Sequence, residues 1–187
     1  MHYLIVVITL LTVGFSSISE GSTERQERHA LNLQVSETVT PSPRLVKALR
    51  ILSKDYKQID KIGHANLAYW YTVAGNMYGV DPVLMVSKTA IESSFNPKAK
   101  SNHGAIGMTQ VIPKHWGYTK QELLDYRTSI LAGAEVASVY RSKCGGNMRC
   151  AMQMYNVGET AYAKGKRNAK YTQRINRVLS YVGGRKL

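Results

Sequence analysis

Residues 81–97 read DPVLMVSKTAIESSFNP, and this stretch predicts a helix that ends beside a single carboxylate. Asp81-Pro82 is a strong helix start, because aspartate caps the first free N–H groups and proline suits the first helical position. Asn96-Pro97 must end the helix, since the residue before a proline avoids helical geometry. The pattern therefore places Glu92 near the end of an apolar helix.

Glu92 is the only acidic residue between Asp81 and Glu122. A carboxyl group among apolar side chains is hard to ionise, because leaving water costs the charged form more than the neutral form. Such a group keeps its proton and can donate it to a substrate, as a general acid must. A loop that contains Gly104 and Gly107 follows, and we expect these glycines to let the backbone approach the substrate closely.

The helix by itself favours a simpler interpretation of this carboxylate. On a helical wheel the apolar stripe consists of Val83, Leu84, Val86, Ala90 and Ile91. Glu92 falls off this stripe beside Lys88, which places the two for a solvated ion pair worth about 0.2–0.5 kcal/mol. A close ammonium group would also favour the ionised carboxylate and oppose the acid role.

Other segments show the same helical spacing of apolar residues: 45–52, 67–78, 119–140, 151–155 and 172–182. Gly79 stops the second of these segments. A capping box from Thr119 to Glu122 opens the third as one long helix. We find no apolar alternation of period two and no internal repeat. The sequence therefore predicts a mostly α-helical fold.

The chain divides into three parts by composition. Residues 1–19 hold an apolar run too short for a typical membrane span, which predicts a secretory signal peptide or, alternatively, an uncleaved anchor. Residues 20–43 are polar and end in two prolines, which indicates a flexible lead-in. Residues 44–187 suffice for one domain. We expect an exported protein of the periplasm or cell envelope, with membrane contact only through the N-terminal segment.

The cysteines agree with export. Cys144 and Cys150 bracket the short segment GGNMR, which can bring their Cα atoms within disulfide reach. In an oxidising compartment we expect a disulfide bridge. A cysteine-based zinc site is not expected, because the sequence has no third cysteine and no histidine nearby.

The formal net charge of +13 indicates an anionic partner. Nucleic acid, a phospholipid surface and an acidic cell-wall polymer would all qualify. The basic run KGKRNAK at 164–170 fits no known DNA-binding motif, so nucleic acid is not expected; a solvated surface that holds wall polymer or phosphate head groups is simpler. No metal or other cofactor is expected, since His64, His103 and His115 share no ligand spacing.

Three segments occur in order along the chain: ESSFNPKA at 92–99, GAIGMTQVIP at 104–113 and YNVG at 155–158. Their order and spacing resemble the lytic transglycosylases of the soluble-lytic-transglycosylase (SLT) type. The resemblance implies a lysozyme-like α-helical domain with a substrate cleft, which cleaves peptidoglycan between N-acetylmuramic acid and N-acetylglucosamine. It outweighs the solvated-pair interpretation of Glu92.

The resemblance also implies roles for single residues. Glu92 aligns with the catalytic glutamate of the family, and Ser93 with the serine beside it. Gln110 aligns with the glutamine of a Gly-Leu-Met-Gln segment, and Tyr155 and Asn156 with a Tyr-Asn pair that lies against the sugar. We expect Gln110 to hold an acetamido or hydroxyl group, and Tyr155 to position substrate or hydrogen-bond to the acid.

The sequence departs from the family pattern at several positions. Met108-Thr109 stands where the family has Leu-Met, and Met154 and Val157 replace two alanines. In the final helix, Arg174 or Ile175 is expected to hold the place of a tyrosine that often faces the cleft. These departures put the floor of the cleft and one substrate contact in question.

With no second acid near Glu92 in sequence, we expect a substrate-assisted reaction that leaves a 1,6-anhydro sugar. A hydrolase of lysozyme type is the nearest alternative, and it needs Asp125, Glu135 or Glu159 about 5–10 Å across the cleft. A non-catalytic wall-binding or structural piece of an envelope-crossing machine is a second alternative. Secretion systems, conjugation machines and phage-entry machines are the candidate partners, by analogy with small exported enzymes of the resembled type.

Overall fold

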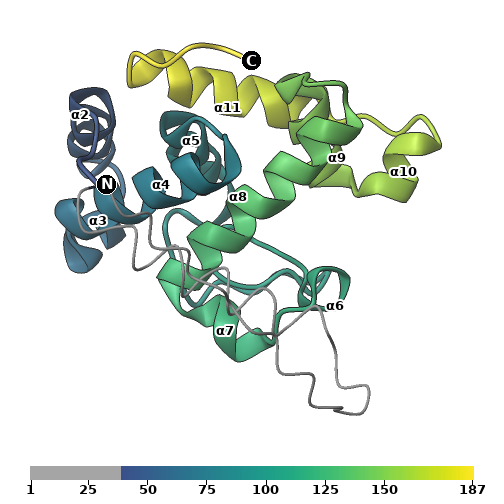
Figure 1. Cartoon of the computed structure of the whole chain (residues 1–187), viewed down its shortest axis with the longest axis horizontal. Helices are drawn as coiled ribbons and strands as arrows, with labels where there is room; N and C mark the ends of the chain where they lie inside the picture. Colours follow the sequence, from purple (N-terminus) through teal and green to yellow (C-terminus); the bar gives the residue numbers. More distant parts are fainter. Residues whose placement is uncertain (1–38) are drawn as a thin grey trace, which may run out of the picture.

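The structure, a computed structural model, describes residues 39–187, and helices are its only extended regular elements in that range (Figure 1). The helices are α2 (Pro43–Leu52), α3 (Gln58–Ile62), α4 (His64–Tyr78), α5 (Pro82–Ser93), α6 (Pro113–Trp116), α7 (Lys120–Leu124), α8 (Tyr126–Lys143), α9 (Met148–Val157), α10 (Glu159–Ala163) and α11 (Ala169–Tyr181). The prediction of a mostly α-helical fold is confirmed. Short antiparallel bridges join Ile106 to Lys100 and to Val111 in the loop after α5.

The expected signal peptide or anchor at 1–19, and most of the expected lead-in, lie outside the described residues. Helix α2 begins at Pro43, and the Ser42 hydroxyl caps it by accepting a hydrogen bond from the backbone N–H of Leu45 at 3.2 Å. Ordered helix therefore starts just before residue 44. Within residues 39–187, no helix combines the length and apolar character that a membrane crossing requires.

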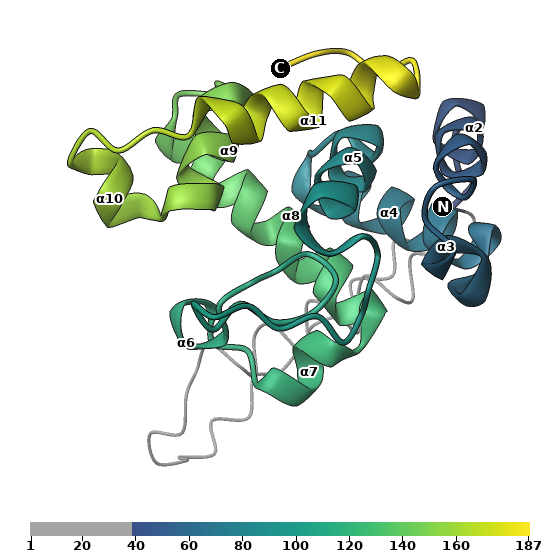
Figure 2. The ribbon, with the colours of Figure 1, turned by 180° about the vertical axis from the view of Figure 1, so that it is seen from behind.

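Helix α5 is buried on every side over residues 83–90 and lies among α2, α4 and α11 (Figures 1 and 2). Its polar side chains tolerate burial because they are short: the hydroxyls of Ser87 and Thr89 donate to the carbonyls of Val83 and Met85, one turn earlier. The sequence predicted that one face of this helix is buried, whereas the structure buries all of its faces over residues 83–90. A solvated Lys88 is also wrong, since its side chain is fully buried.

Helix α5 ends at Ser93, three residues before the Asn96-Pro97 that was expected to end it. Ser94 and Phe95 both adopt left-handed backbone conformations, with φ of 53° and 63°, and they turn the chain sharply. The Phe95 ring is fully buried and packs edge-on against Tyr56, with 5.6 Å between ring centroids. Packing of this aromatic ring in the core stabilises a turn that local preference does not predict.

The long helix expected over 119–140 is two helices. Thr119 and Glu122 form the predicted capping box, but α7 ends at Leu124. Asp125 is extended, and its carboxylate accepts hydrogen bonds from the N–H groups of Arg127 and Thr128 at the start of α8. Aspartate is a better helix cap than a helix interior residue, so it separates the two helices.

The C-terminal helices close the molecule over α5. Cys144 and Cys150 form the expected disulfide, which joins the end of α8 to the start of α9. Helix α11 begins at Ala169, three residues before the expected Thr172, because Asn168 caps it. It lies across both α5 and α9 (Figures 1 and 2).

The loop between α5 and α6 is held against α7 and α8 (Figure 2). Gly107 has φ of 79°, and a Cβ placed on it would lie 1.9 Å from the Leu123 carbonyl oxygen. Gly133 of α8 leaves room for the Thr109 side chain in the same way. The close neighbour of Gly107 on the side of a Cβ is the backbone of α7, so packing within the protein already requires a glycine there. Gly104 is exposed, with open space beside it.

Gly107→Ala should lower the free energy of unfolding by about 2–5 kcal/mol, because it adds a backbone clash to the strain of a positive φ. Gly104→Ala is the matched control, since Gly104 also has a positive φ (82°) but no atom within 4 Å of a new Cβ. Urea unfolding of both variants measures the difference. Equal losses would show that the contact with α7 does not require glycine.

Candidate active site

Glu92 lies in the last turn of α5, and its side chain is 15% exposed. Its Oε1 atom accepts a hydrogen bond from the Tyr171 hydroxyl of α11 at 2.5 Å. The carboxyl group is thus neither free in bulk water nor sealed in the core. It is held in one orientation and can still be reached from solvent.

Tyr171 was missed by sequence reasoning. The expectation that Arg174 or Ile175 takes the tyrosine position in the last helix is wrong, because Ile175 is fully buried in the core and Arg174 is exposed. Tyr171 faces Glu92 instead, and burial, followed by the Glu92 charge, raises its pKa well above the ordinary value. It therefore stays a neutral hydrogen-bond donor. Asn168 is a typical helix cap, and it places the start of α11 before Tyr171. This cap is the signal in the sequence that could have put Tyr171 on the helix.

Lys88 lies one turn before Glu92 and is entirely buried. Its Nζ atom donates to the Thr109 carbonyl at 2.9 Å, lies 3.7 Å from Glu92 Oε1 and stands 3.6 Å from the centroid of the Tyr155 ring. Burial lowers the pKa of Lys88 to about 8, and the attraction of Glu92 offsets part of that effect. A cation inside the protein therefore lies beside the carboxylate.

Tyr155 of α9 donates its hydroxyl to the same Thr109 carbonyl, at 2.9 Å. A direct hydrogen bond from Tyr155 to the acid, one of two expected roles, is therefore not present in the structure. Burial, and then the charge of Glu92, raise the Tyr155 pKa well above its ordinary value. The edge of its ring meets Tyr140, with 6.4 Å between centroids. Tyr155 is a neutral wall of the site whose hydroxyl is already engaged.

Thr109 is the loop residue on which these contacts converge. Its hydroxyl donates to the Ser129 carbonyl at 2.6 Å, and its N–H donates to the Ser129 hydroxyl at 3.1 Å. Thr109 is completely buried, so its carbonyl is fixed in direction by α8. The threonine that departs from the family pattern is thus an anchor of the loop.

Ser93 and Gln110 tie this loop to α5 and to itself. The Ser93 hydroxyl donates to the Met108 carbonyl at 2.6 Å. The Gln110 amide nitrogen donates to the Gly107 carbonyl at 2.9 Å and to the Ala99 carbonyl at 3.3 Å. The N–H groups of Gln110 are therefore used within the loop, which leaves its amide oxygen as the atom that can meet a ligand.

Asn156 is exposed at the end of α9, and its side-chain oxygen accepts a hydrogen bond from the Asn168 amide at 2.7 Å. Asn168 in turn caps the N–H of Tyr171 at 3.2 Å. A chain of hydrogen bonds thus runs from Asn156 through the start of α11 to Tyr171 and Glu92. The structure therefore connects Asn156 to the acid indirectly.

The three other carboxylates that a hydrolase could use are engaged elsewhere. Asp125 caps α8, Glu135 accepts from the Tyr118 hydroxyl at 2.6 Å, and Glu159 pairs with Lys143 at 2.6 Å. In the part of the chain that the structure describes, no cluster of three or more His, Cys, Asp or Glu side chains could hold a metal ion. The partners that the structure gives Glu92 itself are the Lys88 ammonium group and the Tyr171 hydroxyl.

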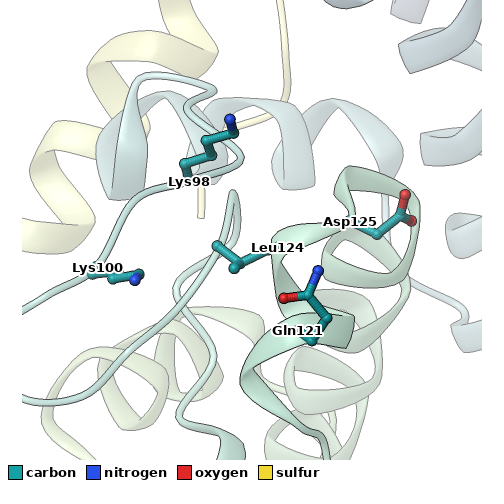
Figure 3. Close-up of a pocket in the computed structure, with 5 residues that line it drawn as sticks. All are labelled: Lys98, Lys100, Gln121, Leu124 and Asp125. Carbon is teal, nitrogen blue, oxygen red and sulfur yellow. The ribbon is translucent and has the colours of Figure 1, made fainter.

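A hollow of about 470 Å³ lies beside the loop after α5, lined by Lys98, Lys100, Gln121, Leu124 and Asp125 (Figure 3). Neither Glu92 nor its hydrogen-bond partner Tyr171 lines it. The lining combines two lysines with one carboxylate, Asp125, which caps α8. We therefore assign the site from the contacts of Glu92.

A protein-family model described as the transglycosylase SLT domain matches residues 70–178, which is more than half of the chain. The match includes Lys88, Glu92, Thr109, Tyr155 and Tyr171. The helical architecture agrees with the lysozyme-like fold of that domain, as the resemblance predicted. The residues that converge on Glu92 therefore all lie within the matched domain.

The buried lysine should make stability depend on pH. Its pKa in the folded protein is about 8, against 10.5 ordinarily, so the unfolded chain binds more protons between these values. The free energy of unfolding should therefore rise by about 3 kcal/mol as pH increases from 8 to 10.5. Lys88→Met should lose this rise.

The measurement is urea unfolding of the wild type and of Lys88→Met at several pH values. The free energy of unfolding of the variant is subtracted from that of the wild type, so that the ionisation of tyrosines, which occurs in both proteins, cancels. Lys47→Met, which removes an exposed lysine of α2, is the control and should follow the wild type. If the difference in free energy of unfolding between the wild type and Lys88→Met does not change with pH across this range, Lys88 is not a buried cation.

Proposed function

Because the chain belongs to the transglycosylase SLT family, we propose that it is a lytic transglycosylase that cleaves the bond between N-acetylmuramic acid and N-acetylglucosamine in peptidoglycan. Glu92 is its acid and then its base. The observation that carries the proposal is the single carboxyl group of Glu92, which is partly buried and oriented by the Tyr171 hydroxyl. A general acid needs both features, access to the substrate and a fixed direction.

The reaction proceeds in two steps on one carboxyl group. Glu92 first donates its proton to the bridging oxygen as that oxygen leaves C1 of the muramic acid, and the acetamido oxygen of the same sugar stabilises the positive centre. Glu92, now ionised, takes the proton of the C6 hydroxyl as O6 bonds to C1. The product is a 1,6-anhydro sugar, no water is consumed, and Glu92 ends protonated as it began.

The other predicted site residues support this acid. Ser93 and Gln110 hold the loop in place, and the amide oxygen of Gln110 is available to an acetamido or hydroxyl group of the glycan. The Tyr155 ring forms a wall against which a sugar can lie. Asn156 keeps the start of α11, and with it Tyr171, in position.

The biological setting that fits these features is local opening of the cell wall. Residues 1–19 would direct export as a signal peptide or anchor, and residues 44–187 would form the catalytic domain. Support for an envelope location comes from the substrate of the family, the disulfide and the strongly basic chain, which suits an anionic wall. A secretion, conjugation or phage-entry machine would be the partner that requires such an opening.

Glu92→Gln should reduce cleavage of purified sacculi by about 10²–10⁴-fold, because the amide cannot transfer a proton. Mass spectrometry of the wild-type products should show 1,6-anhydro ends, lighter by one water than hydrolysis products. Glu159→Gln, which alters an exposed carboxylate paired with Lys143, is the control and should retain activity.

Three outcomes would contradict the proposal in different ways. Products that carry an added water throughout would indicate a hydrolase. Loss of activity in Glu159→Gln would implicate a second carboxylate. Full biological function of Glu92→Gln would indicate a wall-binding protein without catalysis.

Tyr171→Phe should lower kcat by about 10- to 100-fold and leave KM nearly unchanged, because it removes a hydrogen bond to the reacting carboxyl group and no contact with the glycan. Tyr181→Phe on the same helix is the matched control, since Tyr181 is 54% exposed. Steady-state kinetics on soluble glycan strands separates the two constants. A raised KM alone would place Tyr171 in substrate binding.

A further inference from the structure

We propose that Lys88 is a positioning residue for the acid: its buried ammonium group stabilises the carboxylate that Glu92 becomes whenever it gives up its proton. This inference rests on the proposed function and extends it. The geometry that carries it is the 3.7 Å separation between Lys88 Nζ and Glu92 Oε1, with Lys88 completely buried. Because the ammonium group is buried, its attraction for the carboxylate is screened less than that of a surface lysine would be.

Packing alone does not explain a lysine at this position. Transfer of an ammonium group into the protein interior costs several kcal/mol, and an apolar side chain of similar length would avoid that cost. Lys88 donates to the Thr109 carbonyl, but the Tyr155 hydroxyl already satisfies the same oxygen. Two neighbours interact with the positive charge itself, the Tyr155 ring at 3.6 Å and Glu92, and of these Glu92 is the one that can carry a full negative charge.

The titratable side chains around Lys88 and Glu92 are tyrosines that stay neutral, so Lys88 and Glu92 are the groups that carry charge in this region. Four tyrosines from four helices surround the pair directly or through one another: Tyr71, Tyr140, Tyr155 and Tyr171. Burial raises the pKa of each of them, so all four stay neutral below pH 10. Arg174, which is exposed, acts on Tyr171 from the solvent side and is screened by water.

The ammonium group acts on the step in which Glu92 gives up its proton. It lowers the energy of the ionised carboxylate, and so eases proton transfer to the leaving oxygen. The same attraction acts against the protonated form that the first step needs. An enzyme with Lys88 is therefore faster at low pH, and loses activity earlier as the pH rises, than one without it.

The test is the pH–rate profile of wall cleavage by Lys88→Met, which keeps the length of the side chain and removes the charge. The variant should be roughly tenfold slower at its acid plateau, and its alkaline limb should move to higher pH. Thermal unfolding at each pH checks that the variant is folded. Lys47→Met, an exposed change of the same kind, should leave the profile unchanged. An unmoved alkaline limb would overturn the proposal, even if the variant is slower.

A second measurement separates this proposal from the proposed function. NMR of the Glu92 side-chain carboxyl carbon follows its ionisation without any turnover, in the wild type and in Lys88→Met. A titration midpoint that moves up in the variant supports the coupling, whether or not the protein cleaves the wall. A midpoint that does not move overturns the coupling. An inactive wild type with a shifted midpoint would overturn the proposed function alone.

Discussion

The carbonyl oxygen of Thr109 is the contact on which the site depends. It accepts hydrogen bonds from Lys88 of α5 and Tyr155 of α9, while the Thr109 hydroxyl is held by Ser129 of α8. One loop residue therefore connects three helices, α5, α8 and α9. Because the loop is fixed there, Glu92 at the end of α5 is held at a set distance from the Tyr155 ring of α9.

Burial of a charged residue next to the acid is the second constraint. Helix α5 is surrounded by other helices, and it tolerates this because most of its polar groups are hydroxyls that bond within the helix. Lys88 is the exception, and its cost is offset by a carbonyl, an aromatic ring and Glu92. The pair is thus held among neutral tyrosines at some expense of stability, the kind of environment in which functional sites are often found.

Sequence reasoning succeeded at the strongest local signals, and it failed at two weaker caps, Asp125 and Asn168, and where contacts between distant segments decide the structure. The caps at Asp81 and Thr119 and the stop at Gly79 were predicted from single residues, and the helices begin and end there. The end of α5 was misplaced, because the buried ring of Phe95 stabilises left-handed backbone that no local rule favours. Tyr171 was missed, because the cap at Asn168 was not weighed against the apolar spacing that follows it.

The sequence by itself determined the helical class, the capped starts of α5 and α7 and a candidate acid, because capping chemistry and ordered motifs lie within a few consecutive residues. Only the tertiary structure decided which groups surround that acid. Tyr171 is 79 residues from Glu92 along the chain, and Lys88 is buried only because other helices cover α5. Periodicity on one helix cannot report which of its faces another segment will cover, and that coverage turns an apparent surface ion pair into a buried one.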